Sequence, residues 1–370
     1  MNFAFSEEQD ELRTVVRRFL AEKSPESEVR RLMETVPGYD PEVWRLATRQ
    51  LGLSGLAIPQ KFGGSGFGYA ELTVVFEEMG RVLLCAPFFA SVALAANLLL
   101  STDDEIAKAD YLPGLAAGDL IGTVALAEPS GRWDESGVSL AATRTPAGWE
   151  LTGEKLYVLD GTIADLLLIA ARSPAGVSVF AVDKGAPGLA VEPLATMDQT
   201  RKQARVLLRA TPARLVGAEG AGWAAISRML DLAAVALAAE QVGGAQRALE
   251  MAVDYAKTRV QFGKPIGSFQ AIKHKCADML LEVESARSAA YYGGFAADDA
   301  DELPVAASLA KAYCSEAYLH TAAENIQIHG GIGFTWEHPA HLYFKRAKSS
   351  ELLFGDPAYH RELLAQRIGI

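Results

Sequence analysis

The sequence predicts an α+β protein that is mostly helical, with helices first, a β-rich segment in the middle and a long helical segment last. Apolar residues recur at helical spacing through residue 118 and again after residue 219. Between these segments lie short β-rich runs separated by turns. We therefore predict three domains, with boundaries at 1–118, 119–218 and 219–370.

The first predicted helix begins after Ser6. An acidic turn follows this serine, whose side chain can cap the free backbone N–H groups of a helix start. The buried face of the helix is predicted from apolar residues at helical spacing, namely Leu12, Val15, Val16, Phe19 and Leu20.

The middle segment contains β-rich runs spaced by about ten residues, a spacing that predicts an antiparallel barrel or sandwich. The runs are IGTVALAE (121–128), VSLAATRT (138–145), GWELTGEKLYVL (148–159), DLLLIAAR (165–172), VSVFAVD (177–183), LAVEPLA (189–195) and RVLLRA (205–210).

Composition excludes several classes of function. The 370 residues are 50% hydrophobic and carry a net charge of -11, which argues against a protein that binds duplex nucleic acid. Three cysteines without metal-ligand spacing favour a reducing cytoplasm. The N-terminus lacks the pattern of a signal peptide, and the apolar run SVALAANLLL is too short to span a bilayer. We expect a cytoplasmic protein without a metal, nucleic-acid or membrane partner.

The stretch YAKTRVQFGKPIGSFQAIKHKCADM, residues 255–279, is the most specific motif. It predicts a helix that ends near Val260, a turn, and a new helix that starts near Ser268. Arg259 and Gln270 flank this turn, where a guanidinium and a carboxamide can reach a phosphate or the edge of an adenine.

The whole chain resembles the acyl-CoA dehydrogenase family. The resemblance rests on residues 255–279, on ALAEPSGRWD (125–134), on LTGEKLYVLDGTIAD (151–165) and on NIQIHGGIGFTWEHPAHLYFKRAK (325–348). It implies an N-terminal helical domain, a central β-domain and a C-terminal four-helix bundle. It also implies FAD bound between the subunits of a dimer or of a dimer of dimers.

The resemblance further implies which residues hold FAD. From one subunit, the diphosphate and adenine would be contacted by Arg259, Phe262 and Gln270. From the neighbouring subunit, they would be contacted by Gln327, Gly330 and Gly331 of the QIHGG motif, where glycine lets backbone N–H groups approach phosphate. The segment LAEPSG would contact the flavin ring, although Tyr157 stands where the family usually has tryptophan and Leu159 where a hydroxyl is usual.

The family's reaction needs a carboxylate, because a proton leaves the carbon beside a CoA thioester carbonyl while the next carbon gives hydride to the flavin. By resemblance, the base would stand at Phe354 or at Ala233, which lies 26 residues before Arg259. Neither residue can accept a proton. The nearby carboxylates are Asp356, Glu351 and Glu240.

Two of these carboxylates are candidate bases. Asp356 lies two residues beyond the usual position, but an aspartate before proline is commonly a turn residue. Glu240 lies two helical turns, about 10 Å, beyond Ala233, and a buried helical carboxylate is commonly paired with a cation.

Three hypotheses remain open. In the first, the chain is the supporting subunit of a heteromeric enzyme, since MDQTR (197–201) and the missing base resemble the non-catalytic chain of bacterial sterol-type heterotetramers. In the second, the chain is a self-sufficient homodimer or homotetramer that uses Asp356 or Glu240. In the third, it is a non-enzymatic scaffold for acyl-CoA or flavin. The resemblance implies an acyl-CoA thioester as substrate and an electron-transfer flavoprotein or similar acceptor.

The remaining charged residues near the C-terminus have no predicted chemistry. No histidine has zinc-like helical spacing, and His329 is expected to be structural beside the diphosphate. Lys345, Arg346 and Lys348 are expected to form a solvated basic helix face.

Overall fold

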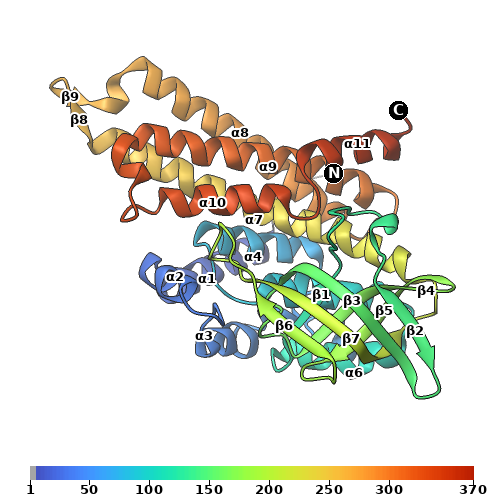
Figure 1. Ribbon diagram of the computed structural model, residues 1–370. Helices are drawn as coiled ribbons and strands as arrows, with labels where there is room; N and C mark the ends of the chain where they lie inside the picture. The colour runs from blue at the N-terminus through green and yellow to red at the C-terminus, as the bar shows by residue number, and fades with distance from the viewer. Residues whose placement is uncertain (1–5) are drawn as a thin grey trace. The chain divides into compact units, whose positions relative to one another are not determined.

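The computed structural model describes residues 6–370, which divide into two compact units. The helical unit contains 6–30, 69–84 and 234–370, and the barrel unit contains 31–68 and 85–233. The element order confirms the predicted succession of helices, strands and helices (Figure 1). The domain boundaries at 1–118, 119–218 and 219–370 remain predictions. The two compact units do not test them, because each unit combines several segments of the chain.

The barrel unit has one strand for each predicted run. The strands are β1 (Gly122–Ala125), β2 (Ala141–Thr145), β3 (Gly148–Leu159), β4 (Leu166–Ser173), β5 (Gly176–Asp183), β6 (Leu189–Pro193) and β7 (Gln203–Val216). Its helices include α3 (Pro41–Arg45), η1 (Leu46–Gln50), η4 (Phe89–Ala96), α5 (Asn97–Leu100) and α6 (Glu105–Ala117). The apolar run 91–100 lies in η4 and α5 and is largely buried.

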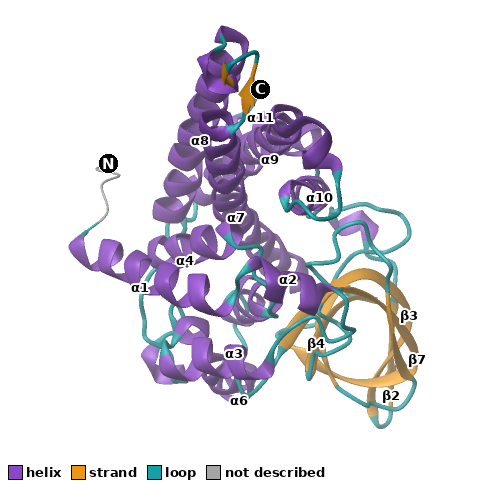
Figure 2. Ribbon diagram, turned by 90° about the vertical axis from the view of Figure 1, so that its left-hand side faces the viewer, coloured by secondary structure: helices purple, strands orange, loops and turns teal. Residues whose placement is uncertain are grey.

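The strands close into a ring. Strands β4, β2, β3, β7 and β5 pair in this order, and β5 pairs again with β4, as Figure 2 shows in a view along the barrel. Alternate residues of the strands form one buried cluster that includes Leu151, Ile169, Phe180 and Val206.

The barrel is antiparallel as predicted except in two places. Strand β4 pairs in parallel with β1 and, through a single residue pair, with β2. The connection from β1 to β4 contains the whole β2–β3 hairpin, so it is long enough to return the chain in the same direction.

The helical unit is built from long helices that pack side by side (Figure 1). They are α1 (Glu7–Lys23), the start of α2 (Glu26–Met33), α4 (Tyr69–Arg81), most of α7 (Gly222–Thr258), α8 (Gln270–Ala296), α9 (Glu302–His329), α10 (Ala340–Leu352) and α11 (Pro357–Ile368). Ser6 caps α1 as predicted: its side chain accepts from the backbone N–H of Gln9, and the Gln9 side chain accepts in return from the Ser6 N–H.

Helix α7 is the central helix of this unit. Its length and composition would suit a membrane span, but 72% of its most apolar window is buried inside the protein, as in the core helix of a bundle. Two glycines permit close packing around it. A Cβ atom at Gly243 would lie 1.8 Å from the carbonyl oxygen of Glu77 on α4, and one at Gly244 would lie 2.4 Å from the Tyr318 ring on α9.

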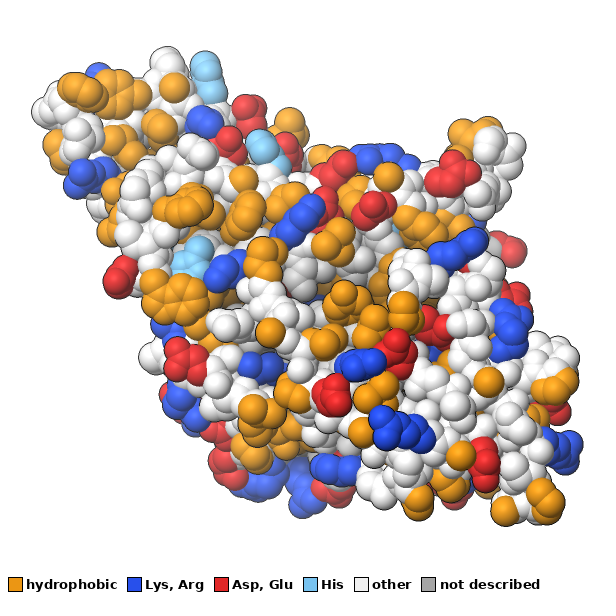
Figure 3. Space-filling model, viewed as in Figure 1, with side chains coloured by type: hydrophobic (Ala, Val, Ile, Leu, Met, Phe, Trp, Pro, Cys, Tyr) orange, Lys and Arg blue, Asp and Glu red, His pale blue; other side chains and the backbone are white. Residues whose placement is uncertain are grey.

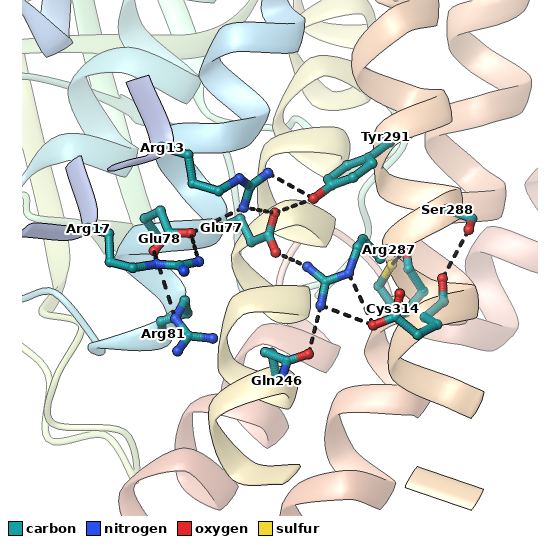
Figure 4. Close-up of polar contacts among 12 residues, drawn as sticks. Arg13, Arg17, Glu77, Glu78, Arg81, Gln246, Arg287, Ser288, Tyr291 and Cys314 are labelled. Carbon is teal, nitrogen blue, oxygen red and sulfur yellow. Dashed lines mark hydrogen bonds and ion pairs between the residues drawn. The ribbon is translucent and has the colours of Figure 1, made fainter. Parts of the chain in front are cut away.

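Two buried carboxylates on α4 join the neighbouring helices (Figure 4). The Glu77 carboxylate accepts from Arg13 of α1 at 2.9 Å, from the Tyr291 hydroxyl of α8 at 2.7 Å, and from Arg287 of α8. Burial by itself lowers the pKa of Arg287, but Glu77, Tyr291 and Glu284 together more than offset this effect, and the pKa is raised. Glu77 therefore connects α1, α4 and α8 through a single side chain.

Glu78 makes a second junction beside the first. It accepts two hydrogen bonds from Arg17 of α1, at 2.8 and 2.7 Å, and one from Arg13 at 3.1 Å. Arg81, one turn further along α4, approaches the same carboxylate at 3.8 Å. Because Arg13 bridges both glutamates, the two junctions form one continuous network.

Replacing Glu77 by glutamine tests this network. The change leaves Arg13 and Arg287 largely buried without their common counter-ion, so we expect a loss of about 3–5 kcal/mol in the free energy of unfolding, measured by urea denaturation. Glu316→Gln is the matched control, since Glu316 pairs with Arg361 at the exposed surface and should cost at most about 1 kcal/mol. Equal losses in the two variants would contradict the assignment.

Candidate functional site

The turn between α7 and α8 lies where the sequence predicts it. Helix α7 ends at Thr258, a small hairpin follows with β8 (Val260–Gln261) and β9 (Lys264–Pro265), and α8 begins at Gln270. The backbone of Arg259 is fixed, because its N–H donates to Tyr255 at 2.8 Å and its carbonyl accepts from Ile266 at 2.8 Å. Its side chain is exposed and has no ion pair within residues 6–370. Arg259 therefore offers an uncommitted guanidinium.

The hairpin tip carries an aromatic ring that is open to solvent. Phe262 is 90% exposed and has a left-handed backbone, with φ of 52°. Lys264 lies 4.5 Å over the ring of Phe269, and Gln270 is exposed at the start of α8. Figure 3 shows apolar side chains mixed with lysine and arginine at this end of the helical unit. Exposed apolar groups of this size are typical of surfaces that meet a ligand or another chain.

The QIHGG motif forms the end of α9. Gly330 has φ of 62° and ψ of -140°, a conformation that is essentially restricted to glycine. Gly330 and Gly331 are exposed, and a Cβ atom at either position would meet nothing within 4 Å. Gln327 is exposed as well. The motif thus presents an open backbone and a carboxamide.

An aromatic stack brings the two motifs together. The ring of His329 lies 4.3 Å from that of Tyr255, which is one helical turn before Arg259. His338 lies 4.3 Å from His329. Burial lowers the pKa of His329, and its Nδ1 is 2.8 Å from the carbonyl of Asn325. His329 is therefore a buried and hydrogen-bonded side chain, and its place beside a diphosphate stays a prediction.

The combined set of groups suits an anionic dinucleotide. An uncommitted guanidinium, two exposed carboxamides and two open glycine residues lie at one end of the helical unit, and all of them can donate hydrogen bonds to phosphate oxygens or base edges. The described residues contain no group of three or more histidine, cysteine or acidic side chains placed to hold a metal ion. The types of donor therefore fit the diphosphate and adenine of FAD, whether the two motifs reach the cofactor from one subunit or, as the resemblance implies, from two.

Phe354 lies in the turn between α10 and α11 and is 7% exposed. Its φ of 61° is left-handed, which is uncommon for a bulky residue and needs support from its surroundings. Lys311 of α9 supplies it by donating to the carbonyls of Glu351 and Gly355, both at 3.0 Å. The Nε2 of His360 lies 3.1 Å from the carbonyl of Phe354 itself.

The two side chains that hold this turn are buried. Burial lowers the pKa of Lys311 to about 7, and its third hydrogen bond is to the hydroxyl of Ser315 at 3.0 Å. Burial lowers the pKa of His360 to about 3, so this ring is neutral at physiological pH. The neutral ring donates from Nε2 to the carbonyl of Phe354. Its Nδ1 is then unprotonated and has no hydrogen-bond partner in the described part of the chain. The turn is thus fixed without a carboxylate.

The carboxylates near the two expected base positions are engaged elsewhere. Asp356 caps α11, since its side chain accepts from the N–H of Tyr359 at 2.8 Å. Glu240 is buried and accepts from Arg346 at 2.8 Å. Glu351 pairs with Lys348. Ala233, the other expected base position, is completely buried on α7.

Arg346 corrects one sequence-based expectation. It was expected on a solvated basic face. Its side chain is only 3% exposed, because it forms a buried ion pair with Glu240. A signal for this pair was present, since an acidic residue inside the alanine-rich run of α7 needs a buried partner.

In the barrel unit, the LAEPSG segment is held by an ion pair that the sequence analysis missed. Glu128 accepts from the backbone N–H groups of Ser139 and Leu140, both at 3.0 Å, and from Lys155 at 2.6 Å. Lys155 also donates to the carbonyl of Leu126 at 3.0 Å. Burial lowers the pKa of Lys155 to about 8 even though Glu128 opposes the shift. The segment therefore has a fixed backbone.

Three family sequence models match the chain in succession. They describe the acyl-CoA dehydrogenase N-terminal domain at residues 6–119, the middle domain at 123–206 and the C-terminal domain at 220–369. The acyl-CoA dehydrogenase IpdE2 of Mycolicibacterium smegmatis is 37% identical over 354 residues, which cover 95% of this chain and 96% of that protein.

Solved structures agree with these matches. A chain of the ChsE4–ChsE5 complex from Mycobacterium tuberculosis superposes with a TM-score of 0.91 at 29% identity, covering 100% of this chain and 99% of that one. The FAD complex of PigA superposes with a TM-score of 0.93 at 26% identity, covering 100% and 99%. Motifs, fold and these likenesses lead to one conclusion: the chain belongs to the acyl-CoA dehydrogenase family of FAD-dependent oxidoreductases.

Proposed function

We propose that the chain is the supporting subunit of a heteromeric acyl-CoA dehydrogenase that desaturates a bulky CoA thioester. The proton-accepting carboxylate would come from a homologous partner chain. One observation carries this proposal: the expected base position is Phe354, a buried residue that cannot accept a proton.

The engaged carboxylates support the proposal. Asp356, Glu240 and Glu351 each hold another group, so using one as a base would leave a helix cap or a cation without its partner. Lys311 and His360 also fix the turn, and breaking one buried hydrogen bond costs about 1–3 kcal/mol. An alternative conformation of the turn that presents a carboxylate would have to break several of these buried hydrogen bonds.

The exposed groups of the α7–α8 turn and of the QIHGG motif, together called the nucleotide end, suggest what such a subunit contributes. We propose that Arg259 neutralises phosphate charge, that Gln270 and Gln327 bind polar edges of the cofactor, and that Phe262 covers it. Gly330 and Gly331 would bring backbone close to phosphate. FAD, when bound, supplies the hydride-accepting chemistry of the family. The likeness to a chain of the ChsE4–ChsE5 complex supports a pair of non-identical chains.

Some further expectations rest on the resemblance alone. We infer an electron-transfer flavoprotein or a similar carrier as acceptor. A cytoplasmic location is inferred separately, from three cysteines without metal-ligand spacing. The chain would complete a flavin site shared with its partner in a heterotetramer.

Expression alone and with a homologous partner chain tests the proposal. We expect the chain alone to show no bleaching of flavin absorbance by acyl-CoA, because it offers no base. The co-purified pair should be yellow and should bleach with an acyl-CoA of suitable size. A yellow, active protein obtained from this chain alone would overturn the supporting role.

Asp356→Asn separates the proposal from the self-sufficient enzyme. Asparagine caps a helix about as well as aspartate, so the fold is retained. We expect the turnover of the co-purified pair to stay within about twofold, because no transition-state interaction is removed. A loss of several orders of magnitude would identify Asp356 as the base. For Glu240→Gln, turnover per bound flavin should likewise be unchanged, although breaking the buried pair with Arg346 should lower stability.

Gly331→Ala tests the nucleotide end. A Cβ atom at this position meets nothing within 4 Å, so the melting temperature of the chain should not change. If phosphate lies against this backbone, the added methyl group should weaken FAD retention by about tenfold or more, as measured by flavin content after gel filtration. Unchanged flavin content in Gly331→Ala would place the cofactor elsewhere.

A further inference from the structure

A cavity of about 190 Å³ lies in the helical unit, apart from the residues discussed above. It is formed by the end of α1, the start of α2, the end of α4, the C-terminal half of α7 and the start of α10. Its apolar walls include Val29, Leu83 and Met251. None of the residues that line it has a proposed role in binding FAD or in accepting a proton.

Most of the charges at this cavity are matched in pairs. Arg81 lines the cavity and makes two short hydrogen bonds to Glu250, at 3.0 and 2.8 Å. Burial opposes ionisation of Glu250, but Arg81 lowers its pKa, so this pair stays charged. The Glu26 carboxylate, also at the cavity, accepts from Arg30 at 2.7 Å. These four groups leave no net charge.

Arg247 is the cation that remains. It lies 3.6 Å from Glu250, whose carboxylate is already occupied by Arg81 and by Gln246 at 3.0 Å. Its other contact is with the phenol oxygen of Tyr343. A guanidinium has five N–H donors, so this side chain retains donors for a ligand. The cavity therefore combines apolar walls with a guanidinium that shares its counter-ion, Glu250, with Arg81.

Two neighbouring features support an anionic ligand. Pro339 precedes α10, a helix of 13 residues, and Leu342 and Tyr343 lie near its start, where a helix carries partial positive charge. Burial raises the pKa of Tyr343 to about 12, so its hydroxyl stays protonated and donates to the Arg81 carbonyl at 2.7 Å. Tyr343 therefore adds no negative charge to the wall of the cavity.

We propose that this cavity binds a short-chain aliphatic carboxylate, with the carboxylate on Arg247 and the chain against Val29, Leu83 and Met251. A guanidinium that shares its counter-ion with Arg81 can match one further carboxylate, whereas a phosphate dianion would need a second cation. At about 30 Å³ per water molecule, the cavity holds roughly six waters, which corresponds to an acid of about four to six carbon atoms.

Calorimetric titration of the folded chain with pentanoate tests this proposal. We expect saturable binding that is absent with pentanamide, which has the same shape but no charge. Arg247→Gln should weaken pentanoate binding by about tenfold to a hundredfold, the factor expected for one charge-assisted hydrogen bond. Arg361→Gln is the matched control, because Arg361 pairs with Glu316 at the exposed surface of α11 and should leave binding unchanged. Circular dichroism confirms the fold of each variant.

Several results would overturn the proposal. The first is a folded wild-type chain that shows no saturable binding of pentanoate. The second is equal binding by Arg247→Gln, or equal binding of pentanamide, since either would remove the role of charge. Tighter binding of inorganic phosphate, or of decanoate, would refute the ligand class or its size. None of these results depends on flavin or on a partner chain, so they are distinct from failure of the proposed function.

Discussion

The carboxylates of Glu77 and Glu78 hold the helical unit together, and the proposed nucleotide end and the Phe354 turn both depend on that unit. Through Arg13, Arg17, Arg287 and Tyr291, these two residues of α4 join α1 and α8 in one buried network. A buried ion pair contributes little net stability, because desolvation offsets much of the attraction. Its main effect is to disfavour other arrangements of the helices, since any misplaced partner would leave a buried charge alone.

Within this framework, the nucleotide end and the expected base position differ in their accessibility. The nucleotide end is open, with Arg259 uncommitted and the backbone of Gly331 accessible. The base position is closed, since Phe354 is buried and its turn is tied down by Lys311 and His360. A chain that neither bound FAD nor took part in the reaction would not need an exposed nucleotide end. The contrast fits a protein that completes a flavin site but leaves proton transfer to another chain.

Local signals were enough to predict much of this fold. Each β-rich run became a strand, Ser6 caps the first helix, and the hairpin after Arg259 lies where glycine and proline interrupt the helical pattern. The pairing of strands was less predictable, because parallel contacts of β4 depend on where long connections return. The resemblance to a family, rather than any local pattern, pointed to Gln327 and Gly330.

Long-range pairings account for what the sequence could not predict. Arg346 was wrongly expected in solvent because its partner Glu240 lies 106 residues earlier in the chain. Lys311 supports a turn that ends 44 residues later, and Lys155 holds Glu128 across 27 residues. The cavity beside Arg247 combines five helices. For Glu240 and Lys311, a charged residue in an apolar stretch indicated that a partner was needed without identifying it.

The most direct measurement is a crystal structure of the co-purified pair with a non-reactive CoA thioester. The quantity that decides is the distance from the ligand's α-carbon to the nearest carboxylate oxygen at each flavin site. The account predicts that this oxygen belongs to the partner chain wherever the site is complete. An oxygen of Asp356 or Glu240 within hydrogen-bond reach of that carbon, about 3 Å, would contradict it.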